Sequence, residues 1–409
     1  MGVREVDHLL VGGGVAAATC ARTLREEGAE GTILLVGRES DAPYHRPPLS
    51  KGYLRGESNR ADALVSPDGW WDENGVELLT RTSVMKLDPA ERLATLSTKE
   101  QVRYGNALLA TGANVRRLRA DGSDLEGIHY LRAFGNSDAV REDLAAAERV
   151  VIIGGSYIGC EVAASLVAGF DCHCTVVMQE QVMLERSFGA RIGGFFEGVL
   201  TGHGVAVHGG DELERFEGAD GRVGRVLTKG GLELDCDFVV IGAGVMPDVM
   251  LARTAGLDLG ESGGVRCSSR LESSAPGLYA AGDMCEYASE VHGRPIRAEH
   301  VDVAAEQGKT AALNMLGRDV AHETIPYFFS DLADWASMEY VGPGTGEPVI
   351  RGSLEESDFT AFYVDEGRVT AALTVGRSDD LEHARRLIRS GDEVDAAELA
   401  DGGSDLAAV

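Results

Sequence analysis

The sequence predicts an α/β protein with two Rossmann-like nucleotide-binding domains, and three observations lead to this fold class. A glycine-rich turn, Gly12-x-Gly14-x-x-Ala17, follows a short apolar run and precedes an alanine-rich segment with helical spacing. A second turn of the same design, Gly154-x-Ser156-x-x-Gly159, occurs later in the chain. The length of 409 residues leaves room for two or three domains.

The first turn is typical of a dinucleotide site at the end of a buried strand, Leu9–Val11. Gly12 permits the tight bend, Gly14 lets a pyrophosphate approach the backbone, and the small Ala17 lets the helix pack closely on the strand. The beginning of the helix then offers unpaired N–H groups to the phosphates.

Candidate ligand residues follow the next predicted strand, 32–36. An acid after this strand usually accepts hydrogen bonds from an adenosine ribose, which favours Glu39, although Arg38 precedes it and either residue is a candidate. A proline-stiffened loop, 42–54, carries the cations His45, Arg46 and Lys51. It is either a rigid surface turn or a cationic lining for a diphosphate and a flavin ring.

The region 61–98 predicts a peripheral helix and short strands, with a hairpin over "VMKLDPAERLATL". The run 107–118 predicts a buried strand that ends at a small-residue turn, Ala110-Thr111-Gly112, where backbone could contact a ligand.

Two dinucleotide turns in one chain imply two nucleotides and an electron relay between them. Ser156 replaces the middle glycine of the second turn, and its short side chain should be tolerated. The next strand ends at Met178 rather than at an acid, so Glu180 is the nearest carboxylate. No Arg or Lys lies between residues 175 and 185 to hold a 2′-phosphate, which predicts a preference for NADH over NADPH.

The second half of the chain repeats the pattern of buried strands followed by turns. Residues 232–247 predict a strand with a Gly242-x-Gly244 turn, and the strand 278–281 runs into Gly282 and Asp283. Strand-like runs fill 326–375 and a helix follows over 379–389, whereas the last twenty residues are polar and acidic and are expected to fray.

Composition narrows the class of protein. The net charge of −28 argues against a nucleic-acid partner. Seven cysteines without a C-x-x-C repeat argue against a zinc cluster or disulfide framework, and Cys172-x-Cys174 is interpreted as the start of a buried strand. No signal peptide or membrane-spanning run is apparent, so a cytoplasmic protein without a metal site is expected.

These motifs together resemble the FAD-dependent pyridine nucleotide-disulfide oxidoreductase superfamily, in its branch of ferredoxin reductases and apoptosis-inducing-factor-like proteins. The resemblance runs through "VGGGVAAA", "PYHRPPLSK", "LLATGA", "IIGGSYIGCE", "VIGAGVMPD", "LYAAGDM", "EHVDVA" and "PYFFSDL". It implies a glutathione-reductase-like layout: an FAD-binding domain from 1–115 and 238–322, an NAD(P)H-binding domain at 116–237, and a small C-terminal α+β domain at 323–409.

The resemblance also implies the site residues. Lys51, paired with Glu161 beside the flavin, and His300 would be catalytic. The cofactor-binding residues would be Gly12, Gly14, Ala17, Arg38, Glu39, Arg46, Lys51, Val84, Ala110, Thr111, Gly112, Arg132, Asp283, Glu299, His300 and Phe329 with Gly154, Ser156, Tyr157, Ile158, Gly159, Glu180, Gly242 and Gly244.

Three departures from the family pattern bear on function. Cys20 stands alone where disulfide reductases carry a cysteine pair, Phe329 replaces a common Trp, and Met178 replaces a ribose-binding Glu. The leading hypothesis is an NADH-dependent reductase, monomeric or homodimeric, that passes electrons to a small ferredoxin- or rubredoxin-type iron–sulfur protein. Such a partner would dock on Arg116, Arg117 and Arg119. The alternatives are an NADH oxidase or a quinone or small-molecule reductase, and a redox sensor with a slow NADH–flavin charge-transfer complex.

Overall fold

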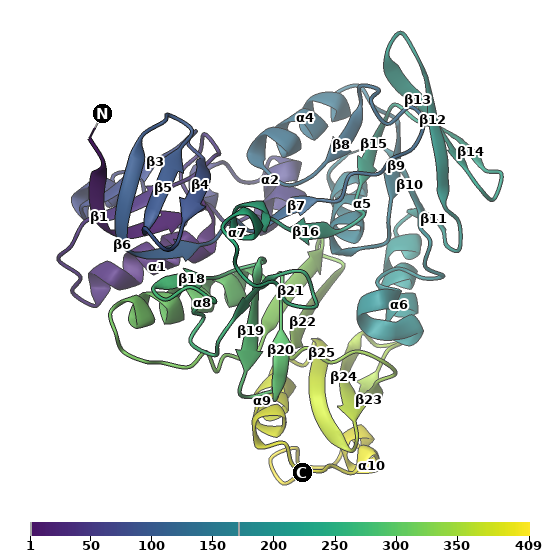
Figure 1. Ribbon diagram of the computed structural model, residues 1–409. Helices are drawn as coiled ribbons and strands as arrows, with labels where there is room; N and C mark the ends of the chain where they lie inside the picture. The colour runs from purple at the N-terminus through teal and green to yellow at the C-terminus, as the bar shows by residue number, and fades with distance from the viewer. Residues whose placement is uncertain (1, 171) are drawn as a thin grey trace. The chain divides into compact units, whose positions relative to one another are not determined.

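Continuous apolar runs form the parallel central strands of two sheets in the computed structural model, which describes residues 2–170 and 172–409 (Figure 1). Each sheet belongs to one of two units. The first unit contains Met1–His45, Ala61–Asn114 and Met246–Tyr327, and the second contains Arg46–Arg60, Val115–Val245 and Phe328–Val409. The domain boundaries expected from the resemblance remain a prediction beside this grouping.

The first unit is built on a sheet of order β3-β2-β1-β6-β5-β4, with β18 added alongside β6. Its strands are β1 (Arg4–Val11), β2 (Ile33–Val36), β3 (Val76–Leu79), β4 (Val84–Asp88), β5 (Leu93–Leu96), β6 (Gln101–Leu109) and β18 (Leu278–Ala280). β1 is parallel to β2 and β6, and Leu10 pairs with Leu35 on one side and Leu108 on the other. The carboxyl ends of β1, β2, β6 and β18 therefore lie at one edge, which is where open α/β sheets bind ligands. The predicted hairpin is confirmed as the antiparallel pair β4–β5.

Two small-residue helices of this unit pack closely together, α1 (Val15–Glu26) and α8 (Val301–Met315). A Cβ added at Gly308 would lie 2.4 Å from the carbonyl oxygen of Ala16, so this approach requires glycine. The remaining elements of the unit are η2 (Ala61–Ala63), α3 (Trp70–Glu73), α7 (Met250–Thr254), β17 (Val265–Cys267), β19 (Cys285–Ser289) and β20 (Arg294–Ile296). The strands β7 (Ala113–Val115) and β16 (Val245–Pro247) lie at two of the points where the chain passes from one unit to the other.

The second unit contains a wholly parallel sheet of order β11-β10-β9-β15-β8. Its strands are β8 (Ile128–Tyr130), β9 (Arg149–Ile153), β10 (His173–Val177), β11 (Ala206–His208) and β15 (Phe238–Ile241). The helices of this part are η1 (Pro47–Ser50), α2 (Gly52–Arg55), α4 (Phe134–Leu144), α5 (Tyr157–Gly169) and α6 (Glu185–Gly202), and an antiparallel sheet is formed by β12 (Leu213–Ala219), β13 (Arg222–Thr228) and β14 (Glu233–Asp235) (Figure 1).

Two expectations about local structure are corrected here. The predicted loop 42–54 becomes helical from Pro47, because proline at the first position of a helix lacks only an N–H that would be unpaired anyway. The predicted single strand 232–247 is three short strands, β14, β15 and β16, of which only β15 is buried throughout.

The C-terminal segment of the second unit forms a five-stranded sheet of order β21-β22-β25-β24-β23. Its elements are β21 (Tyr327–Leu332), β22 (Ala336–Val341), β23 (Val349–Ser353), β24 (Asp358–Asp365), β25 (Arg368–Val375), α9 (Asp380–Ser390) and α10 (Ala396–Ala400). The predicted "VGPGTG" strand is wrong beyond Val341, where β22 ends and two glycines and a proline interrupt pairing.

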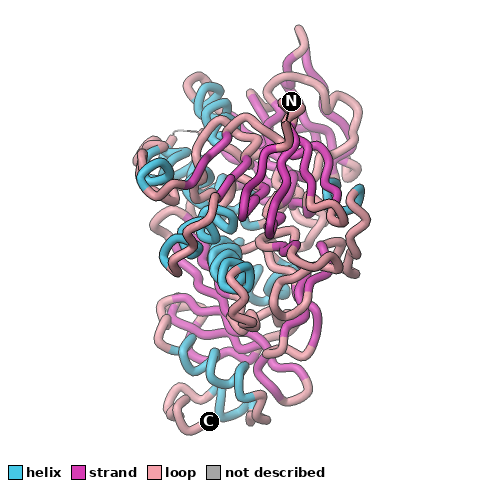
Figure 2. The backbone as a smooth tube through the Cα atoms, turned by 60° about the vertical axis from the view of Figure 1, so that its left-hand side comes forward, coloured by secondary structure: helices cyan, strands magenta, loops and turns pink. Residues whose placement is uncertain are grey.

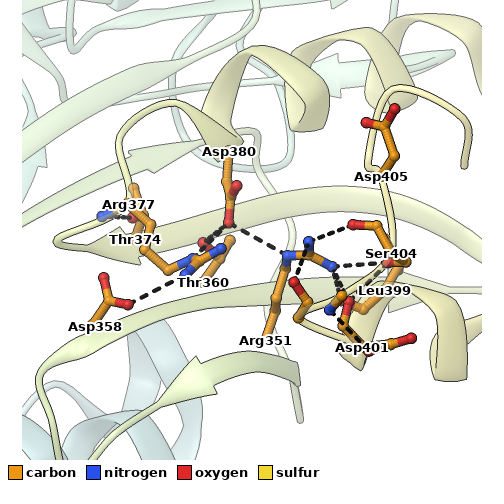
Figure 3. Close-up of polar contacts among 12 residues, drawn as sticks. Arg351, Asp358, Thr360, Thr374, Arg377, Asp380, Leu399, Asp401, Ser404 and Asp405 are labelled. Atoms are coloured by element: carbon orange, nitrogen blue, oxygen red, sulfur yellow. Dashed lines mark hydrogen bonds and ion pairs between the residues drawn. The ribbon is translucent and has the colours of Figure 1, made fainter.

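The end of the chain is packed, which overturns the expectation that the last twenty residues fray. Leu399 and Leu406 are buried, and Figure 2 shows the C-terminus beside the short helices of this segment. The buried guanidinium of Arg351 donates hydrogen bonds to Ser404, 3.0 Å to its Oγ and 2.7 Å to its carbonyl, and also to the carbonyl of Asp401 (Figure 3). Its Nε lies 3.9 Å from the carboxylate of Asp380. Buried leucines and the buried guanidinium of Arg351 thus hold the tail together, and Arg386 also donates hydrogen bonds to the carbonyls of Leu406 and Val409.

We expect Arg351→Met to lower the free energy of unfolding by about 3 kcal/mol, because it leaves several buried acceptors without a donor. Urea unfolding measures this change. Arg389→Met, at an exposed position of α9, is the control and should change stability by less than about 0.5 kcal/mol. Equal effects of the two substitutions would contradict the role given to Arg351.

A buried histidine connects α8 to the sheet of β17, β19 and β20. His322 is 1% exposed, its Nδ1 lies 3.0 Å from the Thr310 hydroxyl, and its ring centre lies 4.9 Å from that of Tyr287. Burial lowers the pKa of His322 to about 4. The folded protein therefore binds this proton less readily than the unfolded chain, whose histidines titrate near pH 6.5.

Stability associated with His322 is expected to be complete above pH 6.5 and to be lost as the pH falls toward 4. Between pH 7 and pH 5 the loss should be about 2 kcal/mol. His322→Gln should reduce the slope of this part of the stability profile, measured by urea unfolding at each pH, whereas His173→Gln at the exposed start of β10 should leave it unchanged. The remaining slope belongs to groups such as His292 and His300, whose pKa burial lowers in the same way. A profile that keeps its slope in His322→Gln would argue against this assignment.

Candidate functional site

The first dinucleotide turn forms at the end of β1, as predicted. Gly12 has a φ of +130°, and a Cβ there would lie 2.0 Å from the carbonyl oxygen of Ala110. Gly14 caps α1, and a Cβ there would meet no atom within 4 Å, so its outer side is open to a ligand. Ala17 is fully buried behind the turn. A turn this close to the neighbouring strand, with an uncovered glycine at the helix start, fits a bound pyrophosphate.

The two candidates after β2 have different partners. Glu39 accepts a hydrogen bond from the Tyr44 hydroxyl at 2.5 Å and is half-buried. Arg38 is exposed and its guanidinium contacts Asp248 at 3.1 Å and Asn114 at 2.8 Å. Glu39 is therefore the better candidate for a ribose. Predicted Val84 begins β4, after a segment whose Thr82 N–H bonds to the carbonyl of Gly37.

The turn after β6 is tied to the segment that follows β16. Thr111 Oγ1 donates to the carbonyl of Asp248 at 2.6 Å, and the N–H of Asp248 donates to the carbonyl of Gly112 at 2.8 Å. Ala110 is the residue that closes onto Gly12. These bonds position the predicted Ala110–Gly112 backbone at the same sheet edge as the first turn.

The turn after β18 brings Asp283 to that edge. The Gly282 N–H donates to the side-chain oxygen of buried Gln307 at 2.7 Å, while Gln307 Nε2 has no partner among the described residues. Arg297, which the sequence analysis did not single out, donates to the Asp283 carbonyl at 2.9 Å and contacts Glu299 at 2.6 Å. A buried amide with a spare donor fits a site built for polar ligand atoms.

His300 occupies the N-cap position of α8, and its side chain makes no capping hydrogen bond to the described backbone there. Burial lowers the pKa of His300 to about 4, with the nearby Asp283 carboxylate opposing the shift. The imidazole is therefore neutral at neutral pH.

The second dinucleotide turn also forms as predicted, between β9 and α5. A Cβ at Gly154 would lie 2.5 Å from the carbonyl oxygen of Gly242, and one at Gly159 would lie 2.1 Å from the carbonyl oxygen of Gly154. Ser156 caps α5, and its hydroxyl donates to the carbonyl of Gly242 at 2.7 Å. The hydroxyl is thus directed at a neighbouring turn, which explains how serine replaces glycine here. Gly244 has open space around it, so this site fits a second nucleotide.

The side chains after β10 explain the Met178 departure. Met178 is buried, and its sulfur lies 2.3 Å from the position that a Cβ on Gly155 would take. It therefore supports the turn from beneath, whereas Glu180 keeps part of its carboxylate accessible. Arg186 is the nearest cation that follows in the sequence, and its side chain is exposed. Its guanidinium folds back and pairs with the carboxylate of Glu180.

A buried ion pair forms between the predicted partners Lys51 and Glu161. Lys51 Nζ lies 2.5 Å from Glu161 Oε1, and their side chains are 13% and 6% exposed. The same ammonium lies 5.9 Å from the ring centre of Phe329, whose side chain is exposed. Nearby, the guanidinium of Arg46 donates to the carbonyl of Arg132, so these two predicted cations lie together.

Tyr157 packs edge-on against Phe328, with ring centres 5.0 Å apart, and Ile158 beside it is half-buried. Sequence reasoning missed two residues that contact the ion pair: Ser50 and Ser330 both donate hydrogen bonds to Glu161. Their signal was their position, since each adjoins a residue singled out in "PLSK" and "YFFSD".

The predicted residues divide between the two units. The first unit contains Gly12, Gly14, Ala17, Arg38, Glu39, Val84, Ala110, Thr111, Gly112, Asp283, Glu299 and His300, and the second contains Arg46, Lys51, Arg132, Glu161, Phe329 and the residues of the second dinucleotide turn with Glu180.

Five of the seven cysteines have buried thiols whose pKa is raised, which makes them poor redox centres. Cys20 is fully buried with its sulfur 3.8 Å from that of Met315, and burial raises the pKa of its thiol. Burial raises the pKa of Cys160, Cys174, Cys236 and Cys285 as well. Cys174 lies in β10 as predicted. None of the helices in the described part of the chain has the length and apolar character that a membrane crossing requires.

Comparison with known proteins places these features in context. Residues 6–308 match the family pattern of pyridine nucleotide-disulphide oxidoreductases, and residues 327–409 match the reductase C-terminal family. The chain is 33% identical to the 5,5′-dehydrodivanillate O-demethylase ferredoxin reductase subunit of a Sphingobium species, covering 98% of this chain and 97% of that one.

The chain is also similar to a plant enzyme and to a protein of known structure. The chain is 31% identical to a monodehydroascorbate reductase of Arabidopsis thaliana, over 97% of this chain and 85% of that one. The crystal structure of a covalent putidaredoxin reductase–putidaredoxin complex matches with a TM-score of 0.92 and 31% identity, covering 98% of this chain and 97% of that one.

We expect NADH to reduce the protein more efficiently than NADPH, because Glu180 would repel a 2′-phosphate. Glu180→Ala should remove that repulsion, release Arg186, and raise the efficiency with NADPH about tenfold. Stopped-flow flavin reduction with each nucleotide measures this. Arg186→Ala, which removes the cation and keeps the acid, should instead weaken the use of NADPH.

Equal efficiency with both nucleotides in the parent protein would refute the preference. An unchanged ratio in Glu180→Ala would show that Glu180 does not cause it.

Proposed function

This chain belongs to the pyridine nucleotide-disulphide oxidoreductase family, and we propose that it is an FAD-containing reductase that takes hydride from NADH and passes electrons to a small iron–sulfur protein. The observation that carries the proposal is the pair of dinucleotide turns in a chain that matches a ferredoxin reductase subunit over 98% of its length. FAD and NAD(P)H are the cofactors of this class of enzyme.

The residues of each turn define what each nucleotide would contact. The backbone at Gly12 and Gly14 would hold the FAD pyrophosphate, and Asp283 would accept a hydrogen bond from a sugar-like hydroxyl. Gly154 and Ser156 would hold the pyrophosphate of NADH. Bound FAD supplies the two-electron to one-electron conversion that links a hydride donor to an iron–sulfur acceptor.

The buried Lys51–Glu161 pair would act on the charge that hydride acceptance brings. An ammonium fixed in a water-poor environment stabilises negative charge without reorganising, and this is where electrostatic contributions are largest. Glu161 compensates the desolvation of Lys51 and holds it in place. Neither side chain has to gain or lose a proton for this role.

Disulfide chemistry is disfavoured by the state of the cysteines. Cys20 lies on the first helix without a neighbouring cysteine, is fully buried, and has a raised thiol pKa. A thiolate is the reactive species in dithiol exchange, so this sulfur is a poor nucleophile. All seven cysteines are free, which supports a reducing location such as the cytoplasm.

Docking of the acceptor is assigned to the exposed cluster of Arg116, Arg117 and Arg119. Arg117 lies over the ring of Tyr130 at 5.1 Å, which limits its motion. In a chain with a net charge of −28, a local group of cations would orient an acidic iron–sulfur protein. The similarity to a monodehydroascorbate reductase favours a second candidate function, reduction of a small molecule.

The proposal is tested by purifying the protein and following electron flow from NADH under anaerobic conditions. We expect one FAD per chain to co-purify and a plant-type [2Fe–2S] ferredoxin to be reduced faster than a quinone or the monodehydroascorbate radical. A preparation that binds no FAD would refute the whole proposal. Faster reduction of the small molecules would replace the iron–sulfur acceptor with the second candidate. A reduced flavin stable in air, with slow turnover, would indicate the redox-sensor alternative.

Lys51→Ala should slow flavin reduction by NADH at least about tenfold, because it removes the cation and leaves Glu161 buried without its charge partner. Stopped-flow absorbance measures the rate. The matched control is Lys229→Ala, which breaks an exposed pair with Glu212 at 2.8 Å and should leave the rate unchanged. Unchanged reduction in Lys51→Ala with flavin still bound would show the pair to be peripheral.

A further inference from the structure

The carboxylate of Glu161 is held by three donors, of which only Lys51 belongs to the ion pair. Oε1 accepts the Ser330 hydroxyl at 2.6 Å in addition to the ammonium, and Oε2 accepts the Ser50 hydroxyl at 2.5 Å. Ser50 and Ser330 are 1% and 2% exposed. A buried carboxylate requires such donors, because each lost hydrogen bond leaves part of its desolvation uncompensated.

One face of α5 organises these contacts. Tyr157, Glu161 and Ser165 follow one another at intervals of four residues, so they lie on the same side of the helix. Ser165 Oγ donates to the Ser50 carbonyl at 2.6 Å, one turn beyond Glu161. The backbone that presents the Ser50 hydroxyl is therefore fixed by the same helix that carries its acceptor.

The strand β21 meets this face in register. Phe328 and Ser330 are alternate residues of β21 and both are buried, whereas Phe329 between them is exposed. Phe328 packs on Tyr157, and Ser330 donates a hydrogen bond to Glu161. Alternate residues of the strand thus contact residues that are one turn apart on the helix. The C-terminal segment thereby supplies a specific hydrogen bond to the ion pair.

We propose that Ser330 is a positioning residue of the reductase, which fixes the Glu161 carboxylate and through it the place of the Lys51 ammonium. The strand β21 contacts the pair from both of its faces, with Ser330 bonded to the carboxylate and Phe329 beside the ammonium. Ser50 completes the carboxylate's set of donors. The inference rests on the proposed function, because the pair matters to hydride acceptance only if FAD is bound beside it.

The hydroxyl of Ser330 is tested by Ser330→Ala and its conservative partner Ser330→Thr. Ser330→Ala should slow flavin reduction by NADH about tenfold, the factor expected for one hydrogen bond to a charged group, and should lower the midpoint potential of the bound flavin. Ser330→Thr keeps a hydroxyl and should restore both quantities toward the parent values.

The matched control is Ser337→Ala. The Ser337 hydroxyl donates to the carboxylate of Asp331 at 2.7 Å, so it makes the same kind of bond on the adjoining strand, but in an exposed position. This variant should keep the parent's reduction rate and midpoint potential. Any general weakening of the C-terminal segment would appear in both alanine variants.

A double-mutant cycle gives a readout that does not depend on turnover. Urea unfolding of the protein as purified compares Ser330→Ala, Glu161→Gln and the double variant. Because the two groups share one hydrogen bond, we expect the double variant to lose less stability than the two single changes added together.

Failure of the inference about Ser330 and failure of the proposed function give different experimental results. A parent protein without FAD, or with FAD that NADH does not reduce, refutes the proposed function and with it the positioning role, even if the cycle shows coupling. With a working parent, Ser330→Ala values equal to those of Ser337→Ala overturn the inference. A change in stability without a change in rate or potential overturns it too, as does a slow Ser330→Ala that threonine fails to restore.

Discussion

The burial of one carboxylate, that of Glu161, is a strong constraint on the second unit. A charge removed from water must be matched by a counter-ion and by hydrogen-bond donors, or the folded state pays several kcal/mol. Lys51, Ser50 and Ser330 meet this requirement from two segments that lie far from Glu161 in sequence. Helix α5, helix η1 and strand β21 are thereby held around a single functional group.

The nucleotide turns depend on a different constraint, the distance between neighbouring backbones. At Gly12 and Gly154 the adjacent strand's carbonyl oxygen occupies the space that a Cβ would need. Both positions also have a positive φ, so close approach and backbone conformation demand glycine for separate reasons. Such turns are specified locally, since the strand, the turn and the helix are consecutive in sequence.

The titratable side chains near the two dinucleotide turns fit a protein that transfers electrons rather than protons. His300 is neutral at neutral pH, and the cysteines on α1 and α5, Cys20 and Cys160, are buried with raised thiol pKa values. The ammonium of Lys51 is paired with the carboxylate of Glu161, which lies on α5 just after the second dinucleotide turn. In the proposed function, this fixed ammonium would stabilise negative charge that is added beside it.

The family, both dinucleotide turns, the parallel strands around them and the Lys51–Glu161 pair could all be predicted from the amino-acid sequence, because they follow from local spacing or from motifs that a whole family shares. It did not reveal Ser50 and Ser330 as donors or the hydrogen bonds of Arg351 to the C-terminal residues. Arg186 could be named as a cation able to fold back, but its pairing with Glu180 came only from the structure. The expected frayed tail was wrong for the same reason. A serine or arginine has no periodic signature, and only tertiary structure decides which distant acceptor it reaches, since burial makes that contact worth forming.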